Sequence, residues 1–338
     1  MAGNLTFDET TINILEIIAE INAYLALVLA PFQFYIILTQ SKTLGAFKWL
    51  IFNHSFWCLL FSLTGNAIKP VMLGGFNSFY CDGYIKNTSR TVSIIGITIF
   101  QMFALMAGGG VIMTVTYRYF GLYPGRLKTI CHSVQMFVFW GFLHFIFLLS
   151  CIINCYNFIS IPEDVMRKRA LNTSSELAPY VNMTTFVFIP QELYQAIHSG
   201  LFVTINGIII MFIVLLILLK KKVSVFLKSD VQRSLIISAI VQIIVTILFV
   251  LLPFGWLSLY LLFGIKIGGK VMFICEAFVA SHALVEYIAT LYVLLPYREY
   301  VKNKYMAFVK KFRHDPELVI TVVSNISSSN HNHSHLRH

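Results

Sequence analysis

Ionisable side chains are rare in the long apolar stretches of this chain, and their positions indicate where its chemistry lies. Glu276, His282 and Glu286 lie within one apolar run near the C-terminus. His282 and Glu286 are four residues apart, so a helix would place them on one face, where a hydrogen bond would lower the cost of burying both. The pair could instead supply half of a metal site, but no second ligand cluster accompanies it. We therefore expect a structural hydrogen bond and no metal.

An arginine closes another apolar run. The stretch from Thr91 to Leu122 ends in Thr116-Tyr117-Arg118-Tyr119-Phe120 and can cross a bilayer as a helix, since roughly 20 apolar residues span the hydrocarbon core. Small residues crowd its middle, namely Ala104, Ala107, Gly108, Gly109 and Gly110. Because small side chains let membrane helices approach closely, we expect the central helix of a bundle here. Arg118 at its end suits a two-state switch, or it simply anchors the helix to lipid phosphates.

No enzyme signature is present. The sequence contains no Gly-x-Ser-x-Gly, His-Glu-x-x-His, phosphate-binding glycine loop or Cys-x-x-Cys motif. We therefore expect neither catalysis nor a cofactor. A transporter would show internal repeats with paired broken helices, and a channel would show a filter loop or a pore-lining ring. Neither pattern is recognisable, so a transporter or channel is the least favoured alternative.

Composition identifies the class of protein. Of the 338 residues, 57% are hydrophobic and only 12% are charged, whereas soluble proteins carry ~25% charged residues. Seven apolar runs exceed the ~17 residues needed to span a bilayer. They are Ile14 to Thr39, Trp49 to Gly74, Thr91 to Phe120, Cys131 to Tyr156, His198 to Leu219, Ser234 to Phe263 and Val271 to Leu295. The sequence predicts an all-α fold, a seven-transmembrane helix bundle in a lipid bilayer, with kinks at Pro31, Pro70 and Pro253.

The charges predict the orientation. The 25 Lys and Arg exceed the 15 Asp and Glu, but they lie in short loops between apolar runs, which argues against binding of nucleic acid. Of these 25 basic residues, 17 lie on the side of the loop after Arg118 or in the C-terminal tail. By the positive-inside rule this side is cytoplasmic. Residues 1–13 then form an extracellular N-terminus, and residues 14–296 form the bundle.

The segment after the seventh run has a different pattern. Residues 297–313 place apolar and aromatic side chains on one helical stripe beside lysines and arginines, which predicts a short amphipathic cytoplasmic helix on the inner leaflet. Residues 314–338 are rich in Ser, Asn and His and are expected to be a disordered cytoplasmic tail. The longest outer loop, Asn157 to Ile197, is expected to be a mobile glycosylated loop or a lid over a ligand pocket.

Several short motifs, in their order and spacing, resemble a known family. They are Phe47-Lys48-Trp49 with Asn53 and Trp57 in the second run, Arg118-Tyr119 closing the third, Gln242 and Pro253 in the sixth, and Pro296-Tyr297-Arg298 ending the seventh. With seven spans and an outside N-terminus, they resemble the G-protein-coupled receptors, in particular the nematode seven-pass chemoreceptors of serpentine receptor class H. The chain departs from the family pattern at Thr116 and Ser62, where acidic residues are common, and at Thr246, where proline is common.

The resemblance implies a chemosensory receptor that detects a small environmental molecule and activates a heterotrimeric G protein. It also implies a place in the plasma membrane, in a sensory cilium. A receptor of the same architecture for a peptide or an internal ligand is the alternative. We expect the ligand among the outer halves of the third, fifth, sixth and seventh spans, with Gln101 and Glu276 as polar contacts.

The switch that couples to the G protein is assigned to six residues. They are Arg118, Tyr119, His282, Glu286, Tyr297 and Arg298. Because position 116 is not acidic, Asp230 is the nearest acidic candidate to hold Arg118 in the resting state.

Two cysteines lie where a disulfide would pin the outer side of the bundle. Cys81 precedes the third span, and Cys155 lies at the outer end of the fourth. In an oxidising compartment we expect a Cys81–Cys155 bridge, with Cys151, one turn deeper, as the competing partner.

The predicted orientation can be tested by glycan mapping. Four sequons, at Asn4, Asn87, Asn172 and Asn182, fall on the predicted outer side, and those at Asn325 and Asn332 fall in the tail. Glycans are expected on the first four only, because glycan transfer takes place in the lumen. Replacing each Asn by Gln and recording gel mobility with and without glycosidase tests this. A glycan at Asn325 would reverse the orientation.

Overall fold

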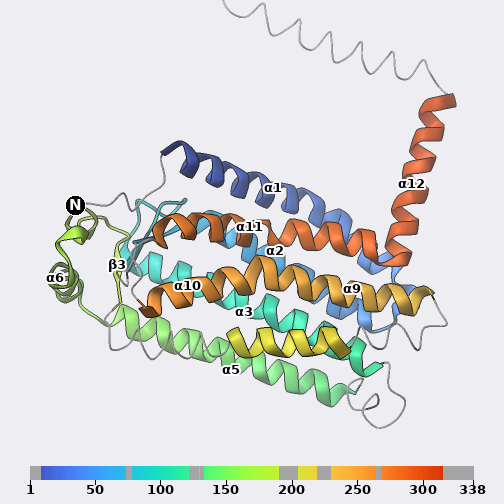
Figure 1. The fold of residues 1–338 in the computed structure, drawn as a ribbon, viewed down its shortest axis with the longest axis horizontal. Helices are drawn as coiled ribbons and strands as arrows, with labels where there is room; N and C mark the ends of the chain where they lie inside the picture. The colour runs from blue at the N-terminus through green and yellow to red at the C-terminus, as the bar shows by residue number, and fades with distance from the viewer. Residues whose placement is uncertain are drawn as a thin grey trace, which may run out of the picture.

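Long helices lie side by side in one bundle (Figure 1). The computed structural model describes residues 9–73, 78–121, 129, 133–189, 205–218, 230–263 and 268–314. The bundle helices are α1 (Glu9–Gln40), α2 (Phe47–Ile68), α3 (Arg90–Gly121), α5 (Val134–Ile159), the helix Ile205–Leu218, α9 (Asp230–Thr246), α10 (Leu252–Phe263) and α11 (Gly268–Val293). A π-helical turn, Ile247–Leu251, joins α9 to α10 into one rod. The predicted all-α seven-transmembrane bundle is confirmed.

The central position predicted for the third span is correct. Helix α3 packs against α2, α5 and α9. A Cβ added at Gly110 would lie 3.1 Å from the Cα atom of His54, so a side chain here would require α2 and α3 to separate by a few tenths of an ångström. A Cβ at Gly109 would lie 2.9 Å from Nε2 of His144 on α5. The small residues in the middle of α3 thus set its distance to two neighbours.

The three prolines in the predicted spans have different effects on their helices. Pro31 lies inside α1, which continues to Gln40. Pro253 follows the π-helical turn, and such a turn accommodates a proline that cannot donate a regular helical hydrogen bond. The expected kink at Pro70 is wrong. Helix α2 ends at Ile68 instead of continuing to Gly74, because Lys69 turns into the left-handed region with φ of 43°.

The outer end of the bundle carries a folded cap that the sequence did not predict. We call the end near α6 the outer end and the end near α12 the inner end (Figure 1). Strands β1 (Pro70–Leu73), β2 (Ser78–Cys81) and β3 (Val187–Phe188) form an antiparallel sheet in the order β1-β2-β3. Helices α6 (Glu163–Thr173) and α7 (Ala178–Val181) flank a 3₁₀ turn, Ser175–Leu177. The described part of the expected loop, as far as Ile189, is therefore ordered structure.

The cap has its own hydrophobic core. Met166 and Ala170 of α6 pack with Leu177, Val181 and Phe186 beneath the sheet. The side chains of Asn87, Asn172 and Asn182 are exposed on the outer side, as glycan acceptors must be. Asn4, Asn325 and Asn332 lie outside the described residues, and glycan transfer to all of these sites stays a prediction.

The expected Cys81–Cys155 disulfide is not formed in the structure. Both residues are free thiols, although both belong to the hydrophobic cluster under β2. The Cys81 thiol is turned towards the Ser93 hydroxyl of α3, and burial raises its pKa to about 11. Cys151, the alternative partner, is also a free thiol.

The predicted amphipathic helix is present as α12, Leu295–His314. It leaves the inner end of the bundle crosswise to the long helices (Figure 1). In its first turn the side chain of Tyr297 is buried, whereas those of Tyr305, Phe308 and Val309, further along the helix, are exposed. Contact of these exposed apolar residues with a membrane surface stays a prediction. The predicted disordered tail, residues 314–338, lies outside the described residues except for His314.

Arg90 joins the cap to the bundle. Its guanidinium donates from Nη1 to the carbonyl oxygen of Ile161 and from Nη2 to that of Phe158, both at 2.6 Å. Phe158 lies in the last turn of α5 and Ile161 follows two residues after its end, where the helix dipole also favours a cation. Arg90 is only 8% exposed, so water replaces these bonds poorly if the side chain is removed.

Replacing Arg90 by Met is expected to lower stability by about 3 kcal/mol, because two hydrogen bonds from a charged donor are lost at ~1.5–3 kcal/mol each. The matched control is Arg167→Met, which removes an exposed ion pair with Glu163 on α6 and should cost less than ~1 kcal/mol. Thermal unfolding of the purified protein in detergent measures both. Equal melting temperatures for the two variants would show that Arg90 does not fasten the cap.

Candidate functional site

The polar interior of the bundle is centred on Glu286 of α11. Its side chain is completely buried. Oε1 accepts a hydrogen bond from Nε2 of Gln242 on α9 at 2.7 Å and another from the Thr290 hydroxyl at 3.1 Å. The same oxygen lies 3.5 Å from Nε2 of His54 on α2. One carboxylate oxygen therefore connects three helices, which is how a charge at membrane depth is usually accommodated.

His54 determines where a proton must lie in this network. Its Nδ1 lies 3.1 Å from the carbonyl oxygen of Ala107 on α3, and because a carbonyl only accepts, Nδ1 carries the hydrogen of that bond. Nε2 then faces the Glu286 carboxylate, and the two lone pairs repel unless a proton lies on one of them. The pair is thus an imidazolium with a carboxylate, or a neutral imidazole with a carboxylic acid. Cys58 contacts the same ring, with Sγ 3.5 Å from Nε2.

The expected hydrogen bond between His282 and Glu286 is wrong. His282 is buried on the same face of α11, but its ring meets the His54 ring edge to face, with centroids 6.3 Å apart. Neither of its nitrogens is hydrogen-bonded to a described residue. The Glu286 side chain turns towards α9 and α2, where Gln242 and His54 offer donors from other helices.

Arg118 is buried at the inner end of α3 and is only 6% exposed. Its Nη1 donates to the Ser238 hydroxyl at 3.1 Å and to the carbonyl oxygen of Leu235 at 3.3 Å, both on α9. Its guanidinium lies over the Phe47 ring of α2, 4.5 Å from the centroid. Nε and Nη2 have no partner among the described residues. This position differs from an anchor in the lipid headgroups, because the charge points into the bundle.

Asp230 does not hold Arg118. Its side chain is exposed at the start of α9, and the described residues contain no ion pair between the two. The partners of Arg118 are the neutral acceptors of Leu235 and Ser238, which lie one to two turns further along the same helix.

The other residues assigned to the switch divide into two groups. Tyr297 is buried at the start of α12 and shares a 2.5 Å hydrogen bond with the Ser41 hydroxyl, and burial raises its pKa to about 12. Tyr119 packs against the hydrophobic cluster between α3, α9 and the helix Ile205–Leu218. Arg298 is exposed and takes no part in this network.

The two residues expected to contact ligand have different surroundings. The side chain of Gln101 on α3 is exposed. Glu276 of α11 lies close enough to Glu16 and Lys69 to feel their charges. Lys69 Nζ lies 2.5 Å from Oε1 of Glu20 and 3.5 Å from Oε2 of Glu16. Burial alone would lower the pKa of Lys69, but the hydrogen bond with Glu20 and the charge of Glu16 outweigh this effect and raise it.

Four residues of the site were missed or underrated from the sequence. His54 and Cys58 are four apart in the second apolar run, the same spacing that drew attention to His282 and Glu286. Applying the same test to both runs would have found them. Ser238 and Phe47, by contrast, carry no signal, because a serine in a helix and an aromatic residue in an apolar run are both common.

One family matches the chain over most of its length. The family described as serpentine type 7TM GPCR chemoreceptor Srh matches residues 10–307. The match extends from the first turn of α1 into α12 and therefore includes Glu286, Arg118 and their partners. A comparison with curated proteins gave no match. The chain belongs to the Srh family of serpentine seven-transmembrane chemoreceptors of the G-protein-coupled type and is a multi-pass membrane protein.

Proposed function

We propose that this receptor binds a small environmental molecule at its outer end and activates a heterotrimeric G protein at its inner end. The plasma membrane of a sensory cilium, with the N-terminus outside, is the proposed location. The observation that carries the proposal is Arg118, a buried cation held at the inner end of α3 by neutral acceptors of a neighbouring helix. A small movement of α9 would release it, because a neutral hydrogen bond binds more weakly than an ion pair.

The contacts supply a route from the outer half of α11 to Arg118. Glu276 and Glu286 both lie on α11, and Glu286 is hydrogen-bonded to Gln242 of α9. Gln242 lies one helical turn after Ser238, so a shift of α11 transmitted through Glu286 moves the acceptor of Arg118. Ligand would then bias a two-state arrangement of helices.

Glu276 is the proposed polar contact for the ligand. It lies nearer the outer end of α11 than Glu286 and faces the charges of Lys69 and Glu16. Gln101 is left out of this proposal because its side chain is exposed on α3. Loss of the response to an active compound in Glu276→Gln, at normal surface expression, would support this placement.

The test of the function is a chemical screen with a calcium readout in cells that express the full chain. An active compound should also accelerate guanine-nucleotide exchange on a co-expressed G protein. Current evoked by the compound in the absence of any G protein would favour a channel and would overturn the proposal.

Replacing Arg118 by Ala should reduce compound-evoked nucleotide exchange by about ten-fold or more, within the usual range of allosteric coupling. The matched control is Arg233→Ala, which removes an exposed arginine from α9 near the same end of the bundle. Surface expression is measured for both by antibody labelling of intact cells. A normal response in Arg118→Ala would remove the switch from this receptor.

An acid placed opposite Arg118 should lower basal activity. Thr116 is two residues from Arg118 and therefore on a different side of α3, so a glutamate at position 116 would not meet the arginine. Ser238→Asp would, because the hydroxyl it replaces is 3.1 Å from Nη1. An ion pair worth ~1 kcal/mol would reduce agonist-free nucleotide exchange about five-fold. The isosteric uncharged control is Ser238→Asn, for which basal exchange should stay near that of the wild type, and a rise in Ser238→Asp would contradict the mechanism.

A further inference from the structure

His282 is a buried side chain that the network around Glu286 does not use. It lies on α11 and is only 1% exposed. Neither Nδ1 nor Nε2 is hydrogen-bonded to a described residue. A neutral imidazole carries one donor and one acceptor, and leaving such a group buried without a partner costs about 1–3 kcal/mol. An unpaired polar group in a core therefore calls for an explanation, such as a partner that it gains in another state of the protein.

An acceptor without a partner lies one helical turn from His282. The contacts of the Glu286 carboxylate with Gln242, Thr290 and His54 all use Oε1, and Oε2 has no partner among the described residues. Side chains four residues apart on a helix face the same way, with Cβ atoms ~5–6 Å apart. In the structure the His282 ring packs against the His54 ring instead. A positive charge on His282 would change this balance, because a charge-assisted hydrogen bond is about twice as strong as a neutral one.

The titratable and charged groups around His282 come from three helices. Helix α2 presents His54 and Cys58, whose Sγ lies beside both imidazole rings. Helix α11 itself presents Glu286, and the charge of Arg118 on α3 reaches that carboxylate. Helix α9 offers an uncharged glutamine amide, and the charged residues of α1 all lie in its first half. Because His54 and Glu286 already share one proton, His282 is the next group to take one up on acidification.

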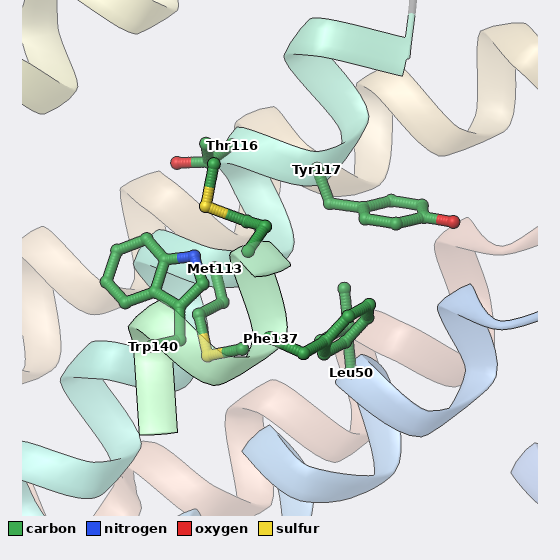
Figure 2. A pocket seen from close by; sticks show the side chains of 7 residues that line it. Leu50, Met113, Thr116, Tyr117, Phe137 and Trp140 are labelled. Atoms are coloured by element: carbon green, nitrogen blue, oxygen red, sulfur yellow. The ribbon is translucent and has the colours of Figure 1, made fainter. Parts of the chain in front are cut away.

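The occupant of a site at His282 must be very small. The pocket that Figure 2 shows between α2, α3 and α5 has room for about one water molecule, because its volume is about 10 Å³. No residue of α11 lines this pocket, so it does not lead to His282. Histidine, cysteine and carboxylate side chains also bind metal ions, but the part of the chain that the structure describes contains no group of three that could hold one. A proton needs neither a cavity nor a third ligand.

We propose that His282 is a proton-binding site and that its protonation loosens α9 from α11. The Glu286 carboxylate is planar, so turning Oε2 towards a positively charged His282 moves Oε1 relative to Nε2 of Gln242. The 2.7 Å hydrogen bond between these two atoms connects α11 with α9, and it weakens as its length and angle depart from the ideal values. The proton thereby acts on the position of a helix.

The regulatory part of this inference rests on the proposed function, whereas proton binding does not. Ser238, which accepts from Arg118, lies one turn before Gln242 on α9. When Glu286 no longer holds α9, the Ser238 hydroxyl leaves Arg118 more easily, and the active arrangement gains population. Acid is therefore expected to raise the agonist-free activity of the receptor.

Proton binding is tested by ¹⁵N NMR of the histidine rings. The full-length protein, labelled with ¹⁵N-histidine, is reconstituted in phosphatidylcholine nanodiscs and titrated from about pH 8 to about pH 5, the range in which histidine changes its charge. A ring that becomes charged in the wild type is expected to be missing from the spectra of His282→Met. This substitution removes no hydrogen bond to a described residue and introduces an adaptable apolar side chain, so the fold should persist. A His282 ring that stays neutral down to pH 5 would overturn the site.

Two further variants separate His282 from its surroundings. His144→Gln removes another histidine of the bundle, whose Nδ1 lies 2.7 Å from the carbonyl oxygen of Trp140 on α5, and should leave the titration of His282 unchanged. Glu286→Gln keeps the shape of the side chain but removes the charge that attracts the proton. At about pH 5.5 the charged fraction of His282 should then fall several-fold. An unchanged fraction would show that the carboxylate is not the partner of the charged ring, and it would overturn the link to α9.

Basal nucleotide exchange on a co-reconstituted G protein supplies the second readout. A change from about pH 7.5 to about pH 5.5 should raise it several-fold in the wild type and in His144→Gln but not in His282→Met, with the G protein alone as the reference. If His282 becomes charged and exchange does not respond, the link to α9 fails while the proton site stands. If no sample catalyses exchange at either pH, the proposed function fails, and the NMR titration decides the proton site.

Discussion

The structure depends on the need to satisfy a carboxylate at membrane depth. Glu286 is completely buried, and in hydrocarbon an unpaired charge costs several kcal/mol at least. Its donors come from Gln242 on α9 and Thr290 on its own helix, and His54 on α2 faces the same oxygen. The contacts of Gln242 and His54 each tie one neighbouring helix to α11. A single oxygen atom therefore connects α2, α9 and α11, in addition to their apolar packing, and a change at any of the three affects its contacts with the other two.

The proton shared by His54 and Glu286 strengthens this coupling. His54 contacts Ala107 of α3 at a point where Gly110 allows the two helices to approach closely. A Cβ at position 110 would lie 3.1–3.2 Å from His54 Cα, Cβ and Nδ1, so a side chain there would shift the imidazole that faces the carboxylate. The packing of α2 against α3 and the contact of His54 with Glu286 are consequently one requirement, and a glycine without a side chain is part of the electrostatics of the site.

The sequence predicts the bundle well and the site only in part. Runs of apolar residues define spans regardless of tertiary context, so the helices, the central place of α3 and the helix after the seventh span were all foreseen. The hydrogen-bond partner of a buried polar side chain cannot be predicted in this way, because donors from several helices compete for it. His282 was expected to bind Glu286 from one turn away, yet Gln242 and His54 occupy Oε1 from other helices. The sheet of the cap was missed because strands as short as Val187–Phe188 have no readable period.

The π-helical turn between α9 and α10 explains how one rod can serve both ends of the receptor. Gln242 and Ser238 lie on the inner side of this turn, where they bind Glu286 and Arg118. Pro253 lies on its outer side and cannot donate a backbone hydrogen bond, so the rod is weakest between residues 247 and 253. If α9 and α10 formed a rigid rod, any movement of α10 would also move the Ser238 hydroxyl, which accepts from Arg118. A rod that can bend at this point would let α10 adjust while the hydrogen bond of Gln242 ties α9 to Glu286 of α11. In the mechanism proposed above, α11 is therefore the helix that would move the acceptors of Arg118.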